Sequence, residues 1–261
     1  MEEKKRLKKY KREKNAFSGM QIQRRDLEIL KSLAGYRFLN TPQIIALHPG
    51  GERNIQRRLQ KLFHEGFIDR PPRQLSYLKP QGYMIYGIGN RGVDLLSENF
   101  PDLKRTKVDW QTKNKEVKQR YIDHTLMISN FRVVLNLALR NEKHTRLVSW
   151  QQGRDLRDYV RIDDRRIALV PDAFFTLEDS EDKMYFFLEA DRSTMTRGRF
   201  LRKMKVYWEW WKKGGHEEKL GIKSFRVLNL CEGEARKKNL RQISREADDR
   251  KTGSLMFWFA T

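Results

Sequence analysis

The sequence has little that would support a secreted or membrane-spanning protein. Its single cysteine, Cys231, cannot form a disulfide within the chain, and no cysteines or histidines have the spacing of a zinc finger. No apolar run approaches the roughly 18 residues that a membrane-spanning helix needs. The N-terminus is charged rather than apolar, so we expect no secretory signal. These absences predict a cytoplasmic protein that does not associate with a membrane.

The signatures of several common enzyme classes are also missing. The sequence contains no glycine-rich phosphate loop and no Ser/His/Asp set whose spacing would support nucleophilic catalysis. It also contains no histidine pair placed to bind a metal ion. Any catalytic site must therefore be built from other residues, and the carboxylates are the first candidates.

Acidic residues are scarce relative to basic ones. The 261 residues include 34 Asp and Glu against 55 Lys and Arg, which gives a formal net charge of +21. A surplus of this size attracts polyanions, of which nucleic acid is the first candidate and an anionic membrane surface the second. The hydrophobic fraction of 38%, with six Trp and fourteen Phe, is enough for packed cores and excludes a wholly disordered chain. The composition therefore favours a globular protein that binds DNA or RNA.

The residue pattern divides the chain into four parts. Residues 1–19 form a basic arm with little apolar content, which predicts disorder and either a solubilising or a phosphate-contacting role. Residues 20–100 alternate short helices and turns before a glycine-rich β stretch, a pattern typical of a winged helix-turn-helix. Residues 101–120 are polar and basic, and we interpret them as a linker. Residues 121–261 then form a second domain.

A long amphipathic helix opens the second domain, and strand-like runs and two helices follow it. We expect helices at 121–141, 196–212 and 234–248, and strands at 146–151, 166–177, 184–191, 225–230 and 255–260. This order implies a mixed sheet flanked by helices. The predicted fold class is therefore α+β, with an N-terminal winged helix-turn-helix followed by an α/β domain.

Basic residues cover the polar side of the helix expected at 52–65, while Ile55, Leu59 and Leu62 form its apolar stripe. An arginine offers a planar fork to guanine edges or phosphates, and an asparagine can bind adenine. A short helix and a tight turn precede this helix, as in proteins that insert a helix into the major groove. The alternative is an ordinary solvated surface helix. The candidate DNA-binding residues are Arg53, Asn54, Arg57, Arg58 and Lys61.

Three carboxylates stand at the ends of two apolar runs. Asp172 follows the first run, and Glu189 and Asp191 close the second, where a period of two puts both on one face of a strand. If the two strands pair as a hairpin, all three carboxylates lie near one end of the sheet. Such a cluster could bind Mg²⁺ or Mn²⁺ for phosphodiester hydrolysis. The alternative is a structural network of ion pairs with arginines.

A lysine on the following helix adds to this constellation. Lys203 lies one turn before Tyr207 on the helix expected at 196–212. An amine that reaches the carboxylates could stabilise the charge that develops on a scissile phosphate, whereas the alternative is an ordinary surface lysine. The candidate catalytic residues are Asp172, Glu189, Asp191 and Lys203, and the three carboxylates are the candidate metal ligands.

Several short motifs occur together along residues 22–231. They are Pro171-Asp172-Ala173-Phe174, Phe187-Leu188-Glu189-Ala190-Asp191-Arg192-Ser193-Thr194, Lys203 with Tyr207, Arg25-Asp26-Leu27 and His124-Thr125-Leu126. Together they resemble the replication-relaxation family of plasmids and other mobile elements. The resemblance implies a role in the replication and relaxation of plasmid DNA.

The second domain is also similar to restriction-endonuclease-like nucleases, which place an Asp on one strand and Glu-x-Lys on the next. Here Asp191 stands at the lysine position, so that Glu-x-Asp replaces Glu-x-Lys. Metal-dependent cleavage of DNA would then require Lys203 to supply the amine from the helix. The sequence leaves open whether the protein is an endonuclease.

Three functions are compatible with these features. The first is a DNA-binding accessory or initiator protein of a mobile element, with a winged helix domain and a nuclease-like domain. The second is an active Mg²⁺-dependent endonuclease that nicks DNA, and the third is a transcriptional repressor whose second domain dimerises or senses a ligand. The carboxylates favour the first two, and Asp191 favours the first over the second. The expected partner is double-stranded DNA, with replication or mobilisation proteins and a second copy of the chain as further candidates.

Overall fold

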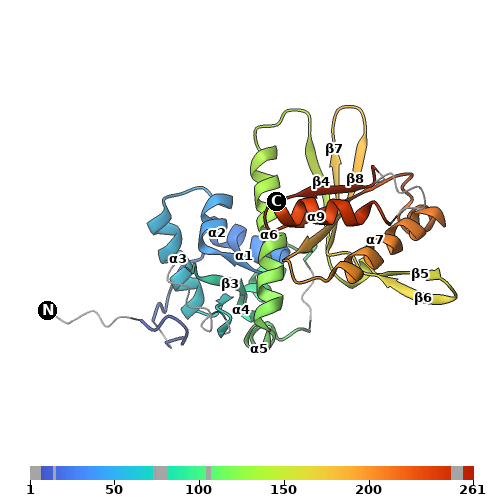
Figure 1. Cartoon of the computed structure of the whole chain (residues 1–261). Coiled ribbons are helices and arrows are strands. Elements are labelled where there is room, and N and C mark those ends of the chain that lie inside the picture. The colour runs from blue at the N-terminus through green and yellow to red at the C-terminus, as the bar shows by residue number, and fades with distance from the viewer. Residues whose placement is uncertain (1–6, 14–15, 73, 75–81, 104–106, 248–254) are drawn as a thin grey trace. The chain divides into compact units, whose positions relative to one another are not determined.

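The computed structural model describes residues 7–13, 16–72, 74, 82–103, 107–247 and 255–261. The chain divides into two compact units, Met1–Leu137 and Ala138–Thr261 (Figure 1). Both units contain helices and strands, and the larger sheet is mixed, so the predicted α+β class is confirmed. Within the described ranges, no helix is both long enough and apolar enough to cross a membrane.

The first unit packs short helices around a three-stranded antiparallel sheet. Its elements are α1 (Arg24–Tyr36), β1 (Leu39–Asn40), α2 (Thr41–Leu47), α3 (Glu52–His64), β2 (Ile68–Asp69), β3 (Ile85–Ile88), α4 (Asn90–Asn99), α5 (Trp110–Glu116) and most of α6 (Gln119–Leu139). β3 lies between β1 and β2 in the sheet. Residues 73 and 75–81, which belong to the expected β stretch, lie outside the described residues.

Local signals explain where α2 and α3 begin and end. The Asn40 side chain accepts a hydrogen bond from the Gln43 backbone N–H at 3.0 Å, and the Gln43 side chain accepts one from the Asn40 N–H at 2.9 Å. This reciprocal cap satisfies two N–H groups that the helix cannot satisfy itself. After α3, Gly66 takes a positive φ of 80°, a conformation that favours glycine. The tight turn at Gly66 leads the chain directly into β2.

The described residues of the segment expected to be a linker belong to the first unit and include α5. Asn114 of α5 is buried and donates hydrogen bonds to Asp69 Oδ2 at 2.7 Å and to the Ile88 carbonyl at 2.8 Å. Each of these bonds joins residues far apart in the sequence, which spacing alone cannot reveal. The expectation that residues 101–120 form a linker is therefore corrected for α5, although residues 104–106 lie outside the described residues.

The long helix α6 also packs in the first unit rather than opening the second. Ser129 donates to the carbonyls of Tyr36 and Phe38 at 3.2 and 2.9 Å, and Ile122 packs against Phe38. Apolar residues lie around most of α6, so its pattern could not indicate which neighbour it covers. The boundary between the units follows Leu137, not residues 101–120.

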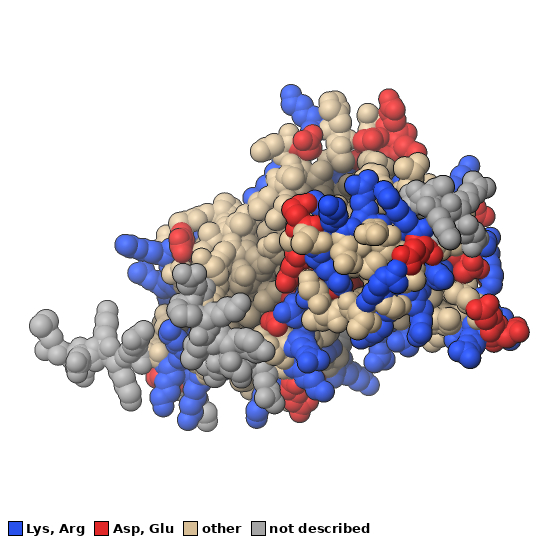
Figure 2. Space-filling view, in the orientation of Figure 1, with Lys and Arg blue, Asp and Glu red and all other residues tan. Residues whose placement is uncertain are grey.

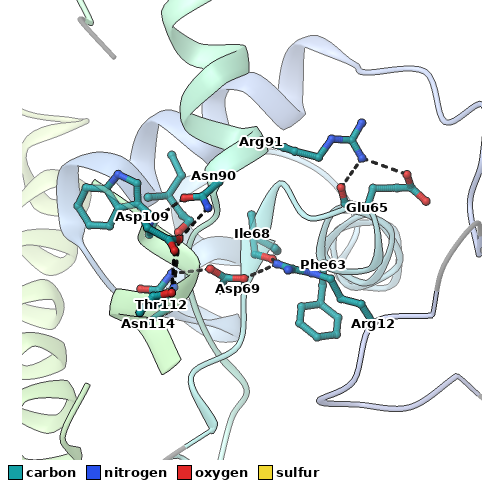
Figure 3. Close-up of polar contacts among 12 residues, drawn as sticks. Arg12, Phe63, Glu65, Ile68, Asp69, Asn90, Arg91, Asp109, Thr112 and Asn114 are labelled. Atoms are coloured by element: carbon teal, nitrogen blue, oxygen red, sulfur yellow. Dashed lines mark hydrogen bonds and ion pairs between the residues drawn. The ribbon is translucent and has the colours of Figure 1, made fainter. Parts of the chain in front are cut away.

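Part of the N-terminal arm is docked on the first unit. Arg12 donates to the carbonyls of Phe63 and Ile68 at 2.9 and 3.1 Å, and it forms an ion pair with Asp69 (Figure 3). The Glu13 N–H donates to His64 Nδ1 at 3.1 Å. The expected disorder of residues 1–19 is thus corrected for residues 7–13, while residues 1–6 and 14–15 lie outside the described residues. Arg12 holds its part of the arm in place because it provides the partner for a buried carboxylate.

The second unit is built around a five-stranded mixed sheet in the order β10-β9-β8-β7-β4 (Figure 1). Its elements are β4 (Arg146–Gln151), β5 (Asp158–Ile162), β6 (Arg165–Leu169), β7 (Ala173–Glu178), β8 (Lys183–Asp191), α7 (Arg197–Lys212), α8 (Gly215–Leu220), β9 (Arg226–Cys231), α9 (Glu234–Ser244) and β10 (Phe257–Ala260). β8, β9 and β10 run parallel, and β7 pairs antiparallel with both β8 and β4.

The strand expected at 166–177 is in fact two strands in two sheets. β6 pairs with β5 in a separate hairpin, and β7 begins after Pro171 in the large sheet. Proline lacks the N–H that a central strand needs, which explains the interruption. Asp163 and Asp164 form the hairpin turn with φ values of 47° and 58°. Two consecutive residues with positive φ match the twist of paired strands, and Asp tolerates this conformation better than most residues.

Aromatic residues hold α7 against the sheet. Phe187 of β8 is 1% exposed, and its ring centroid lies 5.6 Å from that of Tyr207 and 5.1 Å from that of Phe225. Met204, one turn before Tyr207, is fully buried in the same core. This packing determines which residues of α7 point toward the ends of β7 and β8, and so it positions the candidate site.

Candidate functional sites

The exposed side of α3 is basic, as the sequence predicts. Ile55, Leu59 and Leu62 are fully buried, whereas Arg53, Asn54 and Arg57 are exposed. Because the apolar stripe holds one side of α3 against the first unit, the polar residues must face outward. The structure thus presents two guanidinium groups and one carboxamide side by side on a rigid helix.

Arg58 has a different role from its neighbour Arg57. Its guanidinium Nε donates to Asp26 Oδ1 at 2.9 Å, and Nη2 forms an ion pair with the same carboxylate. Asp26 is fully buried, so its charge would be costly without a partner. Arg58 therefore ties α3 to α1, which gives a structural reason for the Arg25-Asp26-Leu27 motif. Of the five predicted DNA-binding residues, Arg58 is the one already engaged with a buried carboxylate.

The docked arm lies against the C-terminal part of α3. The Nζ of Lys61 lies 5.6 Å from the centroid of the Phe17 ring, and Phe17 N–H donates to Glu65 Oε1 at 3.3 Å. Figure 3 shows Arg12 reaching from the arm toward Asp69 beside Phe63. Lys8, Lys9 and Lys11 flank this anchor in the chain. The arm thus adds basic residues next to the helix that carries Arg53 and Arg57.

In the second unit, strand pairing brings Asp172 beside the end of β8. The register pairs Ala173 of β7 with Leu188 of β8. The Asp172 backbone N–H donates to the Leu188 carbonyl at 3.2 Å, and the Asp172 carboxylate accepts a hydrogen bond from the Ala190 N–H at 2.8 Å. The predicted hairpin therefore places Asp172 and Glu189 at one end of the sheet.

Lys203 reaches this end of the sheet from α7. Its ammonium forms an ion pair with Glu189 Oε2, and the hydroxyl of Tyr207 donates to Glu189 Oε1 at 2.6 Å. Lys203 and Tyr207 are one helical turn apart, so both side chains reach the same carboxylate. Glu189 is only 4% exposed. Three of the residues singled out in the sequence, Asp172, Glu189 and Lys203, therefore lie together.

The surroundings raise the pKa values of Glu189, Lys203 and Tyr207. Burial and the nearby Asp172 charge raise the pKa of Glu189 to about 7, although Lys203 and the Tyr207 hydrogen bond oppose this shift. Burial alone would lower the pKa of Lys203, but the charges of Glu189 and Asp172 raise it overall. Burial and the Glu189 charge raise the pKa of Tyr207 well above its usual value. Tyr207 and Lys203 are therefore protonated donors at neutral pH, and Glu189 is the group that titrates there.

Asp191 belongs to a separate ion pair. The Nε of Arg236, on α9, donates to Asp191 Oδ2 at 2.7 Å, and Nη2 of Arg236 donates to the Met195 carbonyl at 2.8 Å. Asp191 is 4% exposed, so Arg236 balances a buried charge. No sequence signal singled out Arg236, because 45 residues separate it from Asp191. For Asp191, the structure matches the alternative of a structural ion pair with an arginine.

Two of the three expected ligands of Mg²⁺ or Mn²⁺, Glu189 and Asp191, are paired with cationic side chains. In the part of the chain that the structure describes, no group of three His, Cys, Asp or Glu side chains could hold a metal ion. Lys203 and Tyr207 occupy the two oxygens of Glu189, and Arg236 neutralises Asp191. A divalent cation would therefore have to displace Lys203 or Tyr207 and use Asp172 and Glu189 alone.

Comparison with known proteins identifies a family for the chain. Neither the curated proteins nor the solved structures provide a match to this sequence. A family model described as replication-relaxation matches residues 30–224. The matched range includes α3 and the site formed by Asp172, Glu189 and Lys203. Because this range spans well over half of the sequence, the chain belongs to the replication-relaxation family.

Proposed function

We propose that this protein binds duplex DNA through α3 and acts in the replication or relaxation of DNA of a plasmid or another mobile element. Membership of the replication-relaxation family supports the role in replication or relaxation. The observation that carries the DNA contact is the exposed row of Arg53, Asn54 and Arg57 on a helix whose other side is fully buried. Such a row can enter a major groove without disturbing the core of the unit.

The order of elements in the first unit supports this assignment. The chain runs α1, β1, α2 and α3 and then enters β2 and β3 of the antiparallel sheet, and four residues separate α2 from α3. This order is similar to that of a winged helix-turn-helix, in which the helix after the turn reads bases. The Arg58–Asp26 ion pair fixes α3 on α1, so Arg53 and Arg57 are presented from a rigid support. The arm adds Lys8, Lys9 and Lys11 for contacts with phosphates, which contribute affinity rather than sequence preference.

The test compares two charge-matched variants in titrations with duplex DNA at several salt concentrations. Arg53→Gln with Arg57→Gln should weaken binding about 10- to 100-fold and reduce the salt slope by about 2, because two phosphate or base contacts are lost. The control, Lys118→Gln with Arg120→Gln, removes two exposed charges from the start of α6 and should bind like the wild type. Equal binding by both variants would overturn the role of α3.

Other partners follow from the same role. A second copy of the chain would place two α3 helices on a duplex, and the DNA site would then contain two half-sites related by a two-fold axis. Replication or mobilisation proteins are further candidate partners. Footprinting on the DNA of the mobile element would distinguish a single site from a pair of half-sites.

A second candidate function is a metal-dependent DNA-nicking activity, as in restriction-endonuclease-like nucleases. The observation that favours it is the position of Lys203, which brings an amine from α7 to Glu189 beside Asp172, while Asp191 occupies the lysine position of the nuclease pattern. A bound Mg²⁺ or Mn²⁺ would supply the activated water. The ammonium of Lys203 would stabilise charge on the scissile phosphate, and the Tyr207 hydroxyl would orient Glu189.

Incubation with supercoiled plasmid and Mg²⁺ or Mn²⁺, followed by a gel for nicked circles, tests this second function. Nicking that requires Glu189 and Lys203 would make the protein an endonuclease. Intact plasmid, with no rise in thermal stability on adding metal, would leave the accessory role in replication or relaxation. A rise in thermal stability without nicking would show a metal site that does not cleave this DNA.

A further inference from the structure

A groove with a cationic rim lies between the β5–β6 hairpin and α7, in the second unit. Its volume is about 830 Å³. Ile162 and Ile167 of the hairpin and Leu201 of α7 provide apolar lining, and Arg165, Arg202 and Lys205 provide the charge. The wall at Gly198 is open, since no atom lies within 4 Å of where a Cβ would be. The groove is therefore accessible, apolar inside and basic at its edges.

The charge of this groove is not balanced locally. Asp163 is the one carboxylate in the lining, against four Lys and Arg residues. Among the described residues, neither Arg165, Arg202 nor Lys205 forms an ion pair, and all three are exposed. Lys and Arg side chains also gather over α7 and α9 on the face seen in Figure 2. Such a surface has the charge that complements a polyanion.

An aromatic ring stands on the solvent side of the same hairpin. Tyr159 of β5 is 41% exposed, and the guanidinium of Arg166 lies over its ring, 4.0 Å from the centroid. The β5–β6 register places Tyr159 opposite Ala168, and both Ala168 and Arg166 belong to the groove lining, so the ring stands beside the groove, at its edge. An exposed ring beside unpaired cations is the combination on which the bases of single strands stack.

We infer that this groove binds a single strand of DNA. Arg165, Arg202 and Lys205 contact the phosphates, and Tyr159 stacks with a base. The apolar lining favours a single strand over a duplex, because a duplex keeps its bases stacked inside and presents mainly phosphates. The groove lies in a different unit from α3, so this assignment goes beyond the duplex contact and does not depend on it. A strand in the groove would run along α7, the helix that also carries Lys203.

The test uses the full chain and a fluorescein-labelled thymidine oligonucleotide of about 12 nucleotides, within the range that one binding groove covers. The groove variant is Arg165→Gln with Arg202→Gln and Lys205→Gln. Its control, Lys143→Gln with Arg154→Gln and Lys223→Gln, removes the same charge from exposed positions elsewhere in the second unit. Thermal melts establish that both variants fold, as expected for exposed substitutions.

The groove variant should bind the oligonucleotide at least about tenfold more weakly than the control variant, with a salt slope smaller by about 2, since three phosphate contacts are lost. Tyr159→Ala should weaken binding further, by about fivefold or more, as expected for the loss of one stacked base. The α3 variant, Arg53→Gln with Arg57→Gln, should lose duplex binding and retain the oligonucleotide. Equal binding by the groove and control variants would overturn the inference. An equal loss on duplex and single strand would also overturn it, because it would show a general electrostatic contact.

Discussion

At the residue scale, the surroundings of Glu189 make the free energy of unfolding depend on the protonation of its carboxylate. Its carboxylate is almost fully buried and contacts one cation, Lys203, and one hydroxyl, that of Tyr207. Burial raises the pKa of Glu189 to about 7, which means that the folded protein holds a proton there more tightly than the unfolded chain. Stability from this group is present below the unfolded pKa of about 4.5 and is lost as the pH rises through 7.

The substitution Glu189→Gln tests this linkage. Between pH 5 and pH 8 the free energy of unfolding of the wild type should fall relative to that of the variant, by up to about 3 kcal/mol, because Gln cannot ionise. Urea unfolding of both proteins across this range measures the difference. The comparison cancels the other titrating groups, provided that they respond alike in both proteins. A difference that stays constant with pH would contradict the raised pKa, and one that grows with pH in favour of the wild type would reverse its sign.

At the element scale, the arm and α5 hold β2 through one buried carboxylate. Asp69 accepts hydrogen bonds from Arg12 of the arm and from Asn114 of α5 (Figure 3). Burial raises the pKa of Asp69 even though Asn114 and Arg12 oppose the shift. The carboxylate therefore depends on both partners, and Arg12 links residues 7–13 of the arm to it.

Arg12→Ala should release the arm from the first unit. Two hydrogen bonds to carbonyls and the ion pair with Asp69 are lost, so we expect the free energy of unfolding to fall by about 2–3 kcal/mol, partly because Asp69 loses one of its partners. Trypsin should then cut after Lys9 or Lys11 much faster than in the wild type. Lys8→Ala, which removes a nearby exposed cation, is the matched control. Cleavage of the variant no faster than that of the control would mean that other contacts hold the arm.

At the scale of the whole molecule, the division into two units follows α6 rather than the charged segment before it. Ile122 and Ser129 of α6 complete the core of the first unit around Phe38. Residues of α5 supply the partners of Asp69 and the Ile88 carbonyl. A first unit without these two helices would expose apolar surface and leave buried polar groups unsatisfied.

Two fragments test this boundary. A fragment of residues 1–141 should fold, melt cooperatively and bind duplex DNA, because it retains α6 in full. A fragment of residues 1–108, cut inside the polar segment, should melt without cooperativity or aggregate, since it lacks both α5 and α6. Circular dichroism melts and DNA titrations compare the two fragments. Cooperative folding of the shorter fragment would show that α5 and α6 are accessory to the first unit.

The sequence by itself determined the features that depend on local spacing. Hydrophobic periodicity predicted α3 and α7 to within two residues, because one buried side of a helix repeats every three to four residues. The net charge of +21 and the exposed polar side of α3 indicated nucleic acid. A period of two placed Glu189 and Asp191 on one face of β8, and the short β7–β8 turn brought Asp172 to Glu189.

Only the tertiary structure decided which charged groups meet. Arg57 and Arg58 are adjacent and identical in type, yet only Arg58 reaches the buried Asp26, which lies 32 residues earlier. Glu189 and Asp191 share a face of β8, yet one meets Lys203 and the other meets Arg236, 45 residues later. The energy of such pairs depends on distance and burial in three dimensions, which sequence spacing does not encode beyond a few helical turns. For the same reason, the sequence could indicate a cluster of carboxylates, but the fold decided that two of them are neutralised by a lysine and an arginine.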